Sequence, residues 1–155
     1  MSKYLTGSTI REVVGSTYIL IIYIDNPFSV MVGKLGFISF NRGYYLYIGS
    51  AKKSLRTRLL RHLSRIKKKF WHIDYVLSDP NPSLIVDIMI SPKACECTIS
   101  QKLYKNSTCK LVKKGFGSSD CHCISHFFQI KEDDDLKSLI KKLNRENFSS
   151  IKSNQ

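Results

Sequence analysis

Residues 17–24 form the longest strongly apolar run of the chain, rich in isoleucine and tyrosine, and it stops at Asp25. A run of this length, bounded on its far side by Asn26-Pro27, predicts a buried strand. It is far shorter than the roughly 20 apolar residues that a membrane-spanning helix needs. The N-terminus lacks the basic-then-apolar layout of a signal peptide, so we expect a cytoplasmic protein. The five cysteines are then predicted to be reduced thiols or metal ligands.

The remaining pattern predicts a mixed α/β (α+β) chain with a small, mostly antiparallel central sheet flanked by helices. Further strands are predicted near 29–33, 36–40, 44–48, 71–77, 84–90, 109–113 and 123–130. Helices are predicted over 54–69, 91–104 and 134–147. Ser54 is the expected N-cap of the first helix, and Ser91-Pro92 is the expected start of the second. Residues 1–148 are predicted to form one domain, with a core over about 15–105, a C-terminal extension over 106–148 and a flexible tail over 149–155.

The chain is strongly basic, with a formal net charge of +13. The segment 52–69 contains many lysines and arginines and no acidic residue, whereas residues 132–135 are all acidic. Such a segregated charge favours a polyanionic partner, and nucleic acid is the first candidate. The alternative is that the charge serves solubility alone. Binding through this segment is predicted to weaken steeply with salt.

The most informative motif is Tyr45-Leu-Tyr-Ile-Gly-Ser-Ala51, which precedes a helix that carries Arg58 and His62. Ser16-Thr-Tyr-Ile-Leu20 lies upstream of it, and Glu96 lies downstream in an early helical turn. In this order the residues resemble the GIY-YIG nuclease superfamily, over about residues 15–105. The strings Phe70-Trp-His-Ile-Asp-Tyr75, Glu96-Cys97 and Ser119-Asp-Cys-His-Cys-Ile-Ser-His126 resemble a small stand-alone branch of it that has no assigned substrate.

The resemblance implies a divalent-metal-dependent endonuclease that hydrolyses DNA phosphodiester bonds and uses Mg²⁺ or Mn²⁺. Because nothing in the sequence looks like a separate sequence-reading module, we expect it to act on a particular DNA structure. It implies a catalytic set in which Glu96 holds the metal and Arg58 contacts the scissile phosphate. Tyrosine titrates near ~10 when unperturbed, so it needs a nearby cation to act as a base, and Lys52 is the candidate. The catalytic set is Tyr18, Tyr47, Arg58, His62 and Glu96. The residues expected to hold phosphate are Gly49, Ser50, Lys52, Lys53, Arg56, Arg61, Arg65, Lys67, Lys68 and Lys69.

Two departures from the superfamily pattern keep other functions open. Ser16 stands where the first motif has glycine, and Ser50 stands where a lysine often follows the second motif; Lys52 or Lys53 would have to compensate. One alternative is a non-catalytic nucleic-acid-binding domain that keeps the fold. Another is a basic protein of an RNA assembly, although DNA is favoured over RNA.

Histidines, cysteines and acids outside the motifs give a second group of candidates. Cys121, Cys123 and His126 are candidate ligands of a soft metal, with Cys95 or Cys97 as a further ligand. If 123–130 is a strand, however, Cys123 and His126 point to opposite faces, so structural zinc is not expected. The favoured interpretation of this cluster is a set of buried thiols with hydrogen-bonded histidines. Candidate supporting residues are His72 and Asp74 on one face of the predicted strand 71–77, and Asp120, His122 and His126.

Overall fold

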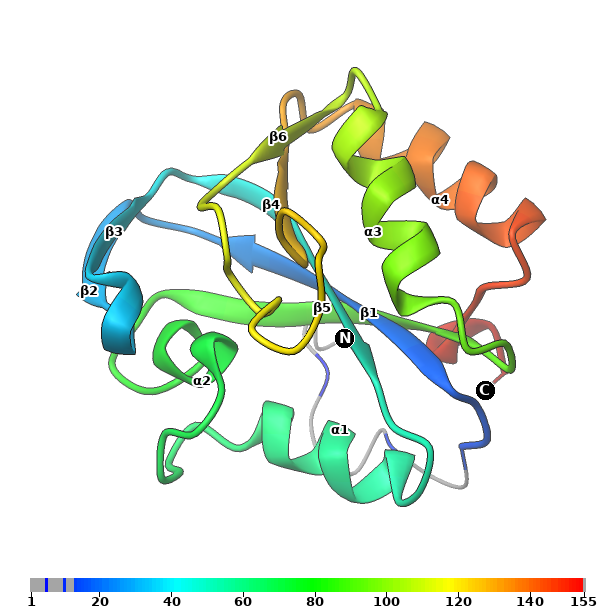
Figure 1. The fold of residues 1–155 in the computed structure, drawn as a ribbon, viewed down its shortest axis with the longest axis horizontal. Coiled ribbons are helices and arrows are strands. Elements are labelled where there is room, and N and C mark those ends of the chain that lie inside the picture. The colour runs from blue at the N-terminus through cyan, green and yellow to red at the C-terminus, as the bar shows by residue number, and fades with distance from the viewer. Residues whose placement is uncertain (1–4, 6–9, 11–12, 155) are drawn as a thin grey trace.

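The computed structural model describes residues 5, 10 and 13–154 (Figure 1). Its central sheet has six strands in the order β6-β7-β4-β1-β5-β8, and each of these strand pairs is antiparallel. The fold class predicted from the sequence is therefore confirmed. The elements are β1 (Thr17–Ile24), β2 (Phe28–Met31), β3 (Phe37–Phe40), β4 (Gly43–Ser50), α1 (Leu55–Leu63), α2 (His72–Val76), β5 (Ser83–Ser91), α3 (Glu96–Lys105), β6 (Cys109–Leu111), β7 (Phe127–Ile130), α4 (Asp135–Arg145) and β8 (Ser149–Ser150), with short 3₁₀ turns over Gly33–Leu35 and Ile151–Asn154.

Strand β1 lies in the middle of the sheet and pairs along its length with both β4 and β5. Its side chains alternate between two hydrophobic cores, as the two-residue period of a strand requires. Tyr18, Leu20 and Ile22 pack in the core that includes α1 and α2, whereas Ile19 and Ile21 pack in the core that includes α3 and α4. Figure 1 shows the two pairs of helices on opposite faces of the sheet. Burial of each isoleucine stabilises the fold by roughly 1.5–3 kcal/mol.

Helix α1 ends at Leu63, well before the predicted end at residue 69. Nζ of Lys67 turns back and lies 3.0 Å from the carbonyl oxygens of both Arg61 and His62. Carbonyls in a last helical turn lack intrahelical partners, so this lysine caps the helix and stops it. The predicted helical segment beyond this point is not helical, and its apolar side chains are not in the core: Ile66 is 86% exposed, and Phe70, just after the predicted helix, is 79% exposed.

The predicted strand over 71–77 is the short helix α2. Oδ2 of Asp74 accepts hydrogen bonds from the backbone N–H groups of Phe70 and Trp71, each at 2.9 Å. A carboxylate in the first turn that takes up free N–H groups is a helix-starting device. Ile73 and Val76, one turn apart, then reach the core.

Ser54 takes the predicted N-cap position of α1, but its side chain does not cap the helix, and the predicted helix start at Ser91-Pro92 was wrong. Ser54 has a left-handed backbone (φ 57°) and makes no side-chain cap to α1. Ser91 is the last residue of β5, and α3 begins at Glu96 after Cys95.

The last segment was predicted to be a flexible tail, but residues 149 and 150 add strand β8 to the edge of β5. The hydroxyl of Ser150 lies 2.7 Å from Oδ2 of Asp87, and Ile151 is buried. The domain therefore continues past residue 148 in the part of the chain that the structure describes. None of the described helices combines the length and the apolar character that crossing a membrane requires.

Candidate functional site

The pairing of β1 with β4 sets Tyr18 directly opposite Gly49. A Cβ atom on Gly49 would lie only 2.3 Å from the Tyr18 ring, so glycine is required for this ring to cross β4. The phenol reaches α1, where its oxygen lies 2.7 Å from Nε2 of His62. The second motif therefore needs glycine at this position, because a side chain there would block the tyrosine of the first motif from the site.

His62 and the two tyrosines form a buried polar group. Burial, followed by the positive charge of Lys67, lowers the pKa of His62 to about 3, so the imidazole is neutral. Burial raises the pKa of Tyr18 well above its usual value, and nearby Tyr47 adds to the rise. Burial also raises the pKa of Tyr47. Both phenols therefore stay protonated at neutral pH.

Arg58 is the cation that acts on both phenols. Its charge opposes the rise in pKa of Tyr18 and of Tyr47, a role that the sequence had suggested for Lys52. The guanidinium donates to the backbone carbonyl of Ser50 and lies 4.8 Å above the centre of the Trp71 ring. Arg58 is thus held between the end of β4 and an aromatic face.

Glu96 is the first residue of α3, and β1 fixes the turn before it. Oγ1 of Thr17 donates to the carbonyl of Lys93 at 2.7 Å and accepts from the N–H of Cys95 at 3.0 Å. Oε1 of Glu96 lies 3.0 Å from Nδ1 of His126. These contacts bring the start of α3 to the edge of the site.

The Glu96 carboxyl is ionised. Burial would raise its pKa, but hydrogen bonds with His126 and Ser50 and the charge of Arg58 outweigh burial and leave the pKa below its ordinary value. Its side chain is 29% exposed. A charged oxygen ligand that solvent can reach fits Mg²⁺, which prefers few protein ligands and retains several waters.

The predicted catalytic residues Tyr18, Tyr47, Arg58, His62 and Glu96 therefore lie in one site, although the sequence separates them widely. Ser50 adjoins two of them, since its carbonyl accepts from Arg58 and the residue also helps to lower the pKa of Glu96.

A cavity of about 290 Å³ opens beside the site and is bordered by Tyr47. His72 lines it and accepts a hydrogen bond at Nδ1 from the N–H of Gly117, at 2.9 Å. Asp120 lines the same cavity and is exposed. The other lining residues are Phe70, Trp71, Gly117 and Ser119. His72 and Asp120 therefore lie near the site, as the sequence suggested.

Asp74 does not pair with His72, because the predicted shared strand face does not exist. Its buried carboxylate forms an ion pair with Arg61 at 2.7 Å and accepts the two N–H groups that begin α2. Burial would raise its pKa, but these hydrogen bonds hold it below the usual value. Asp74 is thus a structural residue that supports the segment bearing Trp71.

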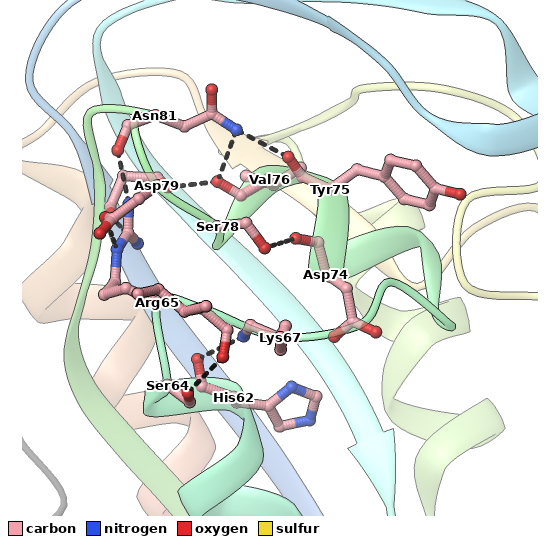
Figure 2. Close-up of polar contacts among 12 residues, drawn as sticks. His62, Ser64, Arg65, Lys67, Asp74, Tyr75, Val76, Ser78, Asp79 and Asn81 are labelled. Atoms are coloured by element: carbon pink, nitrogen blue, oxygen red, sulfur yellow. Dashed lines mark hydrogen bonds and ion pairs between the residues drawn. The ribbon is translucent and has the colours of Figure 1, made fainter.

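The basic segment divides into internal and exposed cations. Figure 2 shows the Arg65 side chain directed at Asp79 and Asn81. Its Nε lies 2.8 Å from Oδ1 of Asp79, and its terminal nitrogens donate to the carbonyls of Asn81 and Ser83, each at 2.6 Å. Figure 2 also shows Lys67 at the end of α1. Arg61, Arg65 and Lys67 therefore hold the chain together, whereas Lys52, Lys53, Arg56, Lys68 and Lys69 are exposed.

Trp71 is a site residue to which the sequence motifs give no role. Its ring lies beneath two guanidiniums, those of Arg58 at 4.8 Å and Arg61 at 5.0 Å. It is the single tryptophan of the chain, which was the available signal. A cation over an indole face is attracted by the ring quadrupole, so Trp71 orients Arg58.

A second group of side chains lies next to Glu96. One ligand atom each from Cys97, Cys121, Cys123 and His126 falls within 4.8 Å of all the others. The expected divergence of Cys123 and His126 was wrong, because strand β7 begins only at Phe127. Cys95 and the exposed His122 lie outside this group.

Comparison with known proteins gives a family and no relative of known activity. Curated proteins and solved structures yielded no match. A family model described as "domain of unknown function DUF123" matches residues 17–148. Because this match spans most of the chain, the protein belongs to the DUF123 family.

Proposed function

We propose that this chain is a divalent-metal-dependent endonuclease of the GIY-YIG type that hydrolyses phosphodiester bonds in DNA. The observation that supports it most is that Arg58, held by the Ser50 carbonyl, lies near enough to a partly exposed Glu96 for its charge to help keep that carboxyl ionised. A fixed cation and a hard anionic ligand are the two groups that phosphodiester cleavage most needs, and here they lie in one site. The sequence resemblance described above assigned the same two residues to these roles.

Arg58 would meet the charge that builds on the phosphoryl oxygens. A planar guanidinium can bind two such oxygens at once, and fixed donors stabilise the transition state more than mobile ones. The carbonyl of Ser50 and the ring of Trp71 hold this guanidinium in place before substrate arrives.

Glu96 would hold one Mg²⁺ or Mn²⁺ ion. Such an ion lowers the pKa of bound water and neutralises developing negative charge. With one carboxylate as the protein ligand, most of its coordination shell is left to water and phosphate, which suits Mg²⁺.

The tyrosines would act as neutral hydrogen-bond donors. Burial keeps both phenols protonated, so neither is poised to remove a proton by itself. Tyr47 borders the cavity and can therefore orient a water or a phosphoryl oxygen there. Tyr18 and the neutral His62 are hydrogen-bonded to each other, and this bond would hold both side chains in place.

The exposed cations would supply the DNA contacts that are independent of sequence. Lys52, Lys53 and Arg56 lie at or before the first turn of α1, the helix that also carries Arg58, and all three are exposed. Each phosphate that such a residue neutralises releases counterions and steepens the salt dependence of binding. Since residues 13–154, which the structure describes, contain no separate sequence-reading module, we expect the enzyme to select DNA by its structure.

Cleavage assays with matched variants test this function. The wild-type protein is incubated with supercoiled, branched and single-stranded DNA in Mg²⁺, in Mn²⁺ and in EDTA. We expect cleavage that requires the metal, is lost in Glu96→Gln and is kept in Glu146→Gln, an exposed glutamate paired with Lys102 at 2.8 Å. DNA binding should survive in both variants.

A non-catalytic nucleic-acid-binding domain is the second candidate, favoured by Ser16 in the first motif and by the burial of both phenols. Tight, salt-sensitive DNA binding without products in any metal would support this candidate and contradict the enzyme. Binding that prefers structured RNA, again without cleavage, would instead indicate a role in an RNA assembly.

A further inference from the structure

Three thiols and one imidazole converge beside α3 from two distant parts of the chain. Cys97 lies in the first turn of α3, whereas Cys121, Cys123 and His126 lie in the long connection between β6 and β7. The four ligand atoms all lie within 4.8 Å of one another. In tetrahedral zinc with Zn–S bonds of about 2.3 Å, neighbouring sulfurs are about 3.8 Å apart. The cluster is therefore within about 1 Å of a closed four-ligand shell.

The cluster differs from an ordinary set of core cysteines. Cys109, which packs in the α3/α4 core, is 7% exposed. Cys97 is exposed and Cys121 and Cys123 are only half-buried, so their placement near one another is not explained by burial of apolar surface. Reduced thiols in this arrangement gain little from packing, whereas metal binding would account for their convergence.

His126 is oriented as a zinc ligand would be. Nε2 lies 3.2 Å from Sγ of Cys121, inside the cluster, while Nδ1 lies 3.0 Å from Oε1 of Glu96 on the other side of the ring. A histidine that ligates a metal through one nitrogen usually donates from the other to a carboxylate or carbonyl, which fixes the tautomer and the ring. Glu96 fills that position here.

The backbone of the β6–β7 connection also favours a metal. Residues 121–126 form no helix or strand, so the two-residue alternation that would separate Cys123 from His126 does not apply. The base of the loop is closed by two backbone hydrogen bonds, from Gly115 N–H to the Ile124 carbonyl at 2.7 Å and from His126 N–H to the Phe116 carbonyl at 2.8 Å. Cys121 and Cys123 lie in the loop that these two bonds close, where a metal would join the loop to Cys97 of α3.

We propose that Cys97, Cys121, Cys123 and His126 bind one structural Zn²⁺ ion. Four protein ligands leave no open position, so this zinc would not activate water. It would tie the β6–β7 loop to the first turn of α3 and, through His126, hold the Glu96 side chain. The inference does not depend on the proposed nuclease activity, since a binding domain would use the same zinc.

Metal analysis of purified protein tests the site without any activity assay. The wild-type chain is produced in zinc-containing medium and purified without chelator, and zinc is measured by elemental analysis. We expect one zinc per chain, retained in Cys95→Ser and Cys109→Ser, which change cysteines outside the cluster. Cys121→Ser and Cys123→Ser should each lose most of it.

Replacement by Co²⁺ in the wild-type protein gives a second readout, which does not depend on whether the cysteine variants fold. The wild-type protein refolded with Co²⁺ should show the visible absorption of a tetrahedral cobalt–thiolate centre. Less than a tenth of a zinc per chain, together with five freely titrating thiols or a disulfide within the cluster, would overturn the proposal. Zinc content that is unchanged in Cys121→Ser and Cys123→Ser would also overturn it.

Discussion

Nδ1 of His126 lies 3.0 Å from Oε1 of Glu96, and the opposite nitrogen of the same ring lies 3.2 Å from Sγ of Cys121. One buried imidazole therefore joins the carboxylate of the proposed nuclease site to the thiol cluster. Two side chains in contact, Glu96 and His126, would thus link the two proposed metals, one held by Glu96 and the other by His126.

His126→Gln should affect both sites at once. We expect loss of the zinc and a fall of about 10–100-fold in cleavage, the range seen when a residue that orients a metal site is removed. Zinc content and the rate of DNA nicking measure the two effects. His122→Gln changes an exposed histidine in the same loop and should alter neither, and an equal loss in both variants would contradict the account.

Gly49→Ala should lower stability, because the new Cβ would lie 2.3 Å from the Tyr18 ring. Forcing a methyl group into a well-packed core typically costs about 1–3 kcal/mol in the free energy of unfolding. Chemical denaturation measures this change, with Lys53→Ala at an exposed position as the control. A Gly49→Ala protein as stable as the wild type would mean that Tyr18 does not cross β4 as described.

Acid should destabilise the protein through His62. Its pKa is about 3 in the folded state and about 6.5 when unfolded, so the unfolded state binds one more proton between these values. The free energy of unfolding should therefore fall as pH drops from about 6.5 toward 3, by at most about 1.4 kcal/mol per pH unit from this residue. Unfolding measured between pH 7 and 5 should show a weaker pH dependence in His62→Gln. An unchanged slope would show that His62 titrates normally.

Arg65 and Lys68 should have different roles although they lie three residues apart in the basic segment. Arg65→Ala leaves the carbonyls of Asn81 and Ser83 and the Asp79 carboxylate without this donor, and should cost about 2 kcal/mol of stability. Lys68→Ala, at an exposed position, should leave the melting temperature unchanged and weaken DNA binding. Thermal unfolding and binding at several salt concentrations separate the two. A variant of Arg65 that unfolds normally but binds DNA poorly would reverse this assignment.

The sequence predicted the long central strands β4, β1 and β5 well because each is an extended, mostly apolar run, such as residues 17–24. It failed where a polar side chain decides the local structure. Lys67 ends α1 early, and Asp74 turns an alternating Trp-x-Ile-x-Tyr pattern into a helix. Neither effect is visible in hydrophobic periodicity, because each depends on where one charged group meets free backbone groups.

The candidate site shows the same division. The motifs identified Tyr18, Tyr47, Arg58 and Glu96, which the fold brings together. The sequence offered Cys97 as a candidate partner of Cys121 and Cys123 but predicted that Cys123 and His126 diverge, because the path of the irregular loop between β6 and β7 is not visible in the sequence. The support of Arg58 by Trp71 likewise arises from a tertiary contact between α1 and the segment before α2.

The rate of DNA nicking in single-turnover reactions tests the central claim most directly, measured with Mg²⁺ for the wild type, Arg58→Ala, Glu96→Gln and the double variant. Removal of one fixed transition-state donor typically costs about 10²–10³-fold. If Arg58 and Glu96 act on the same phosphate, the double variant should be no slower than the worse single variant, because residues that act as a unit are not additive. A wild-type protein that binds DNA without nicking it, or losses that multiply in the double variant, would contradict the account.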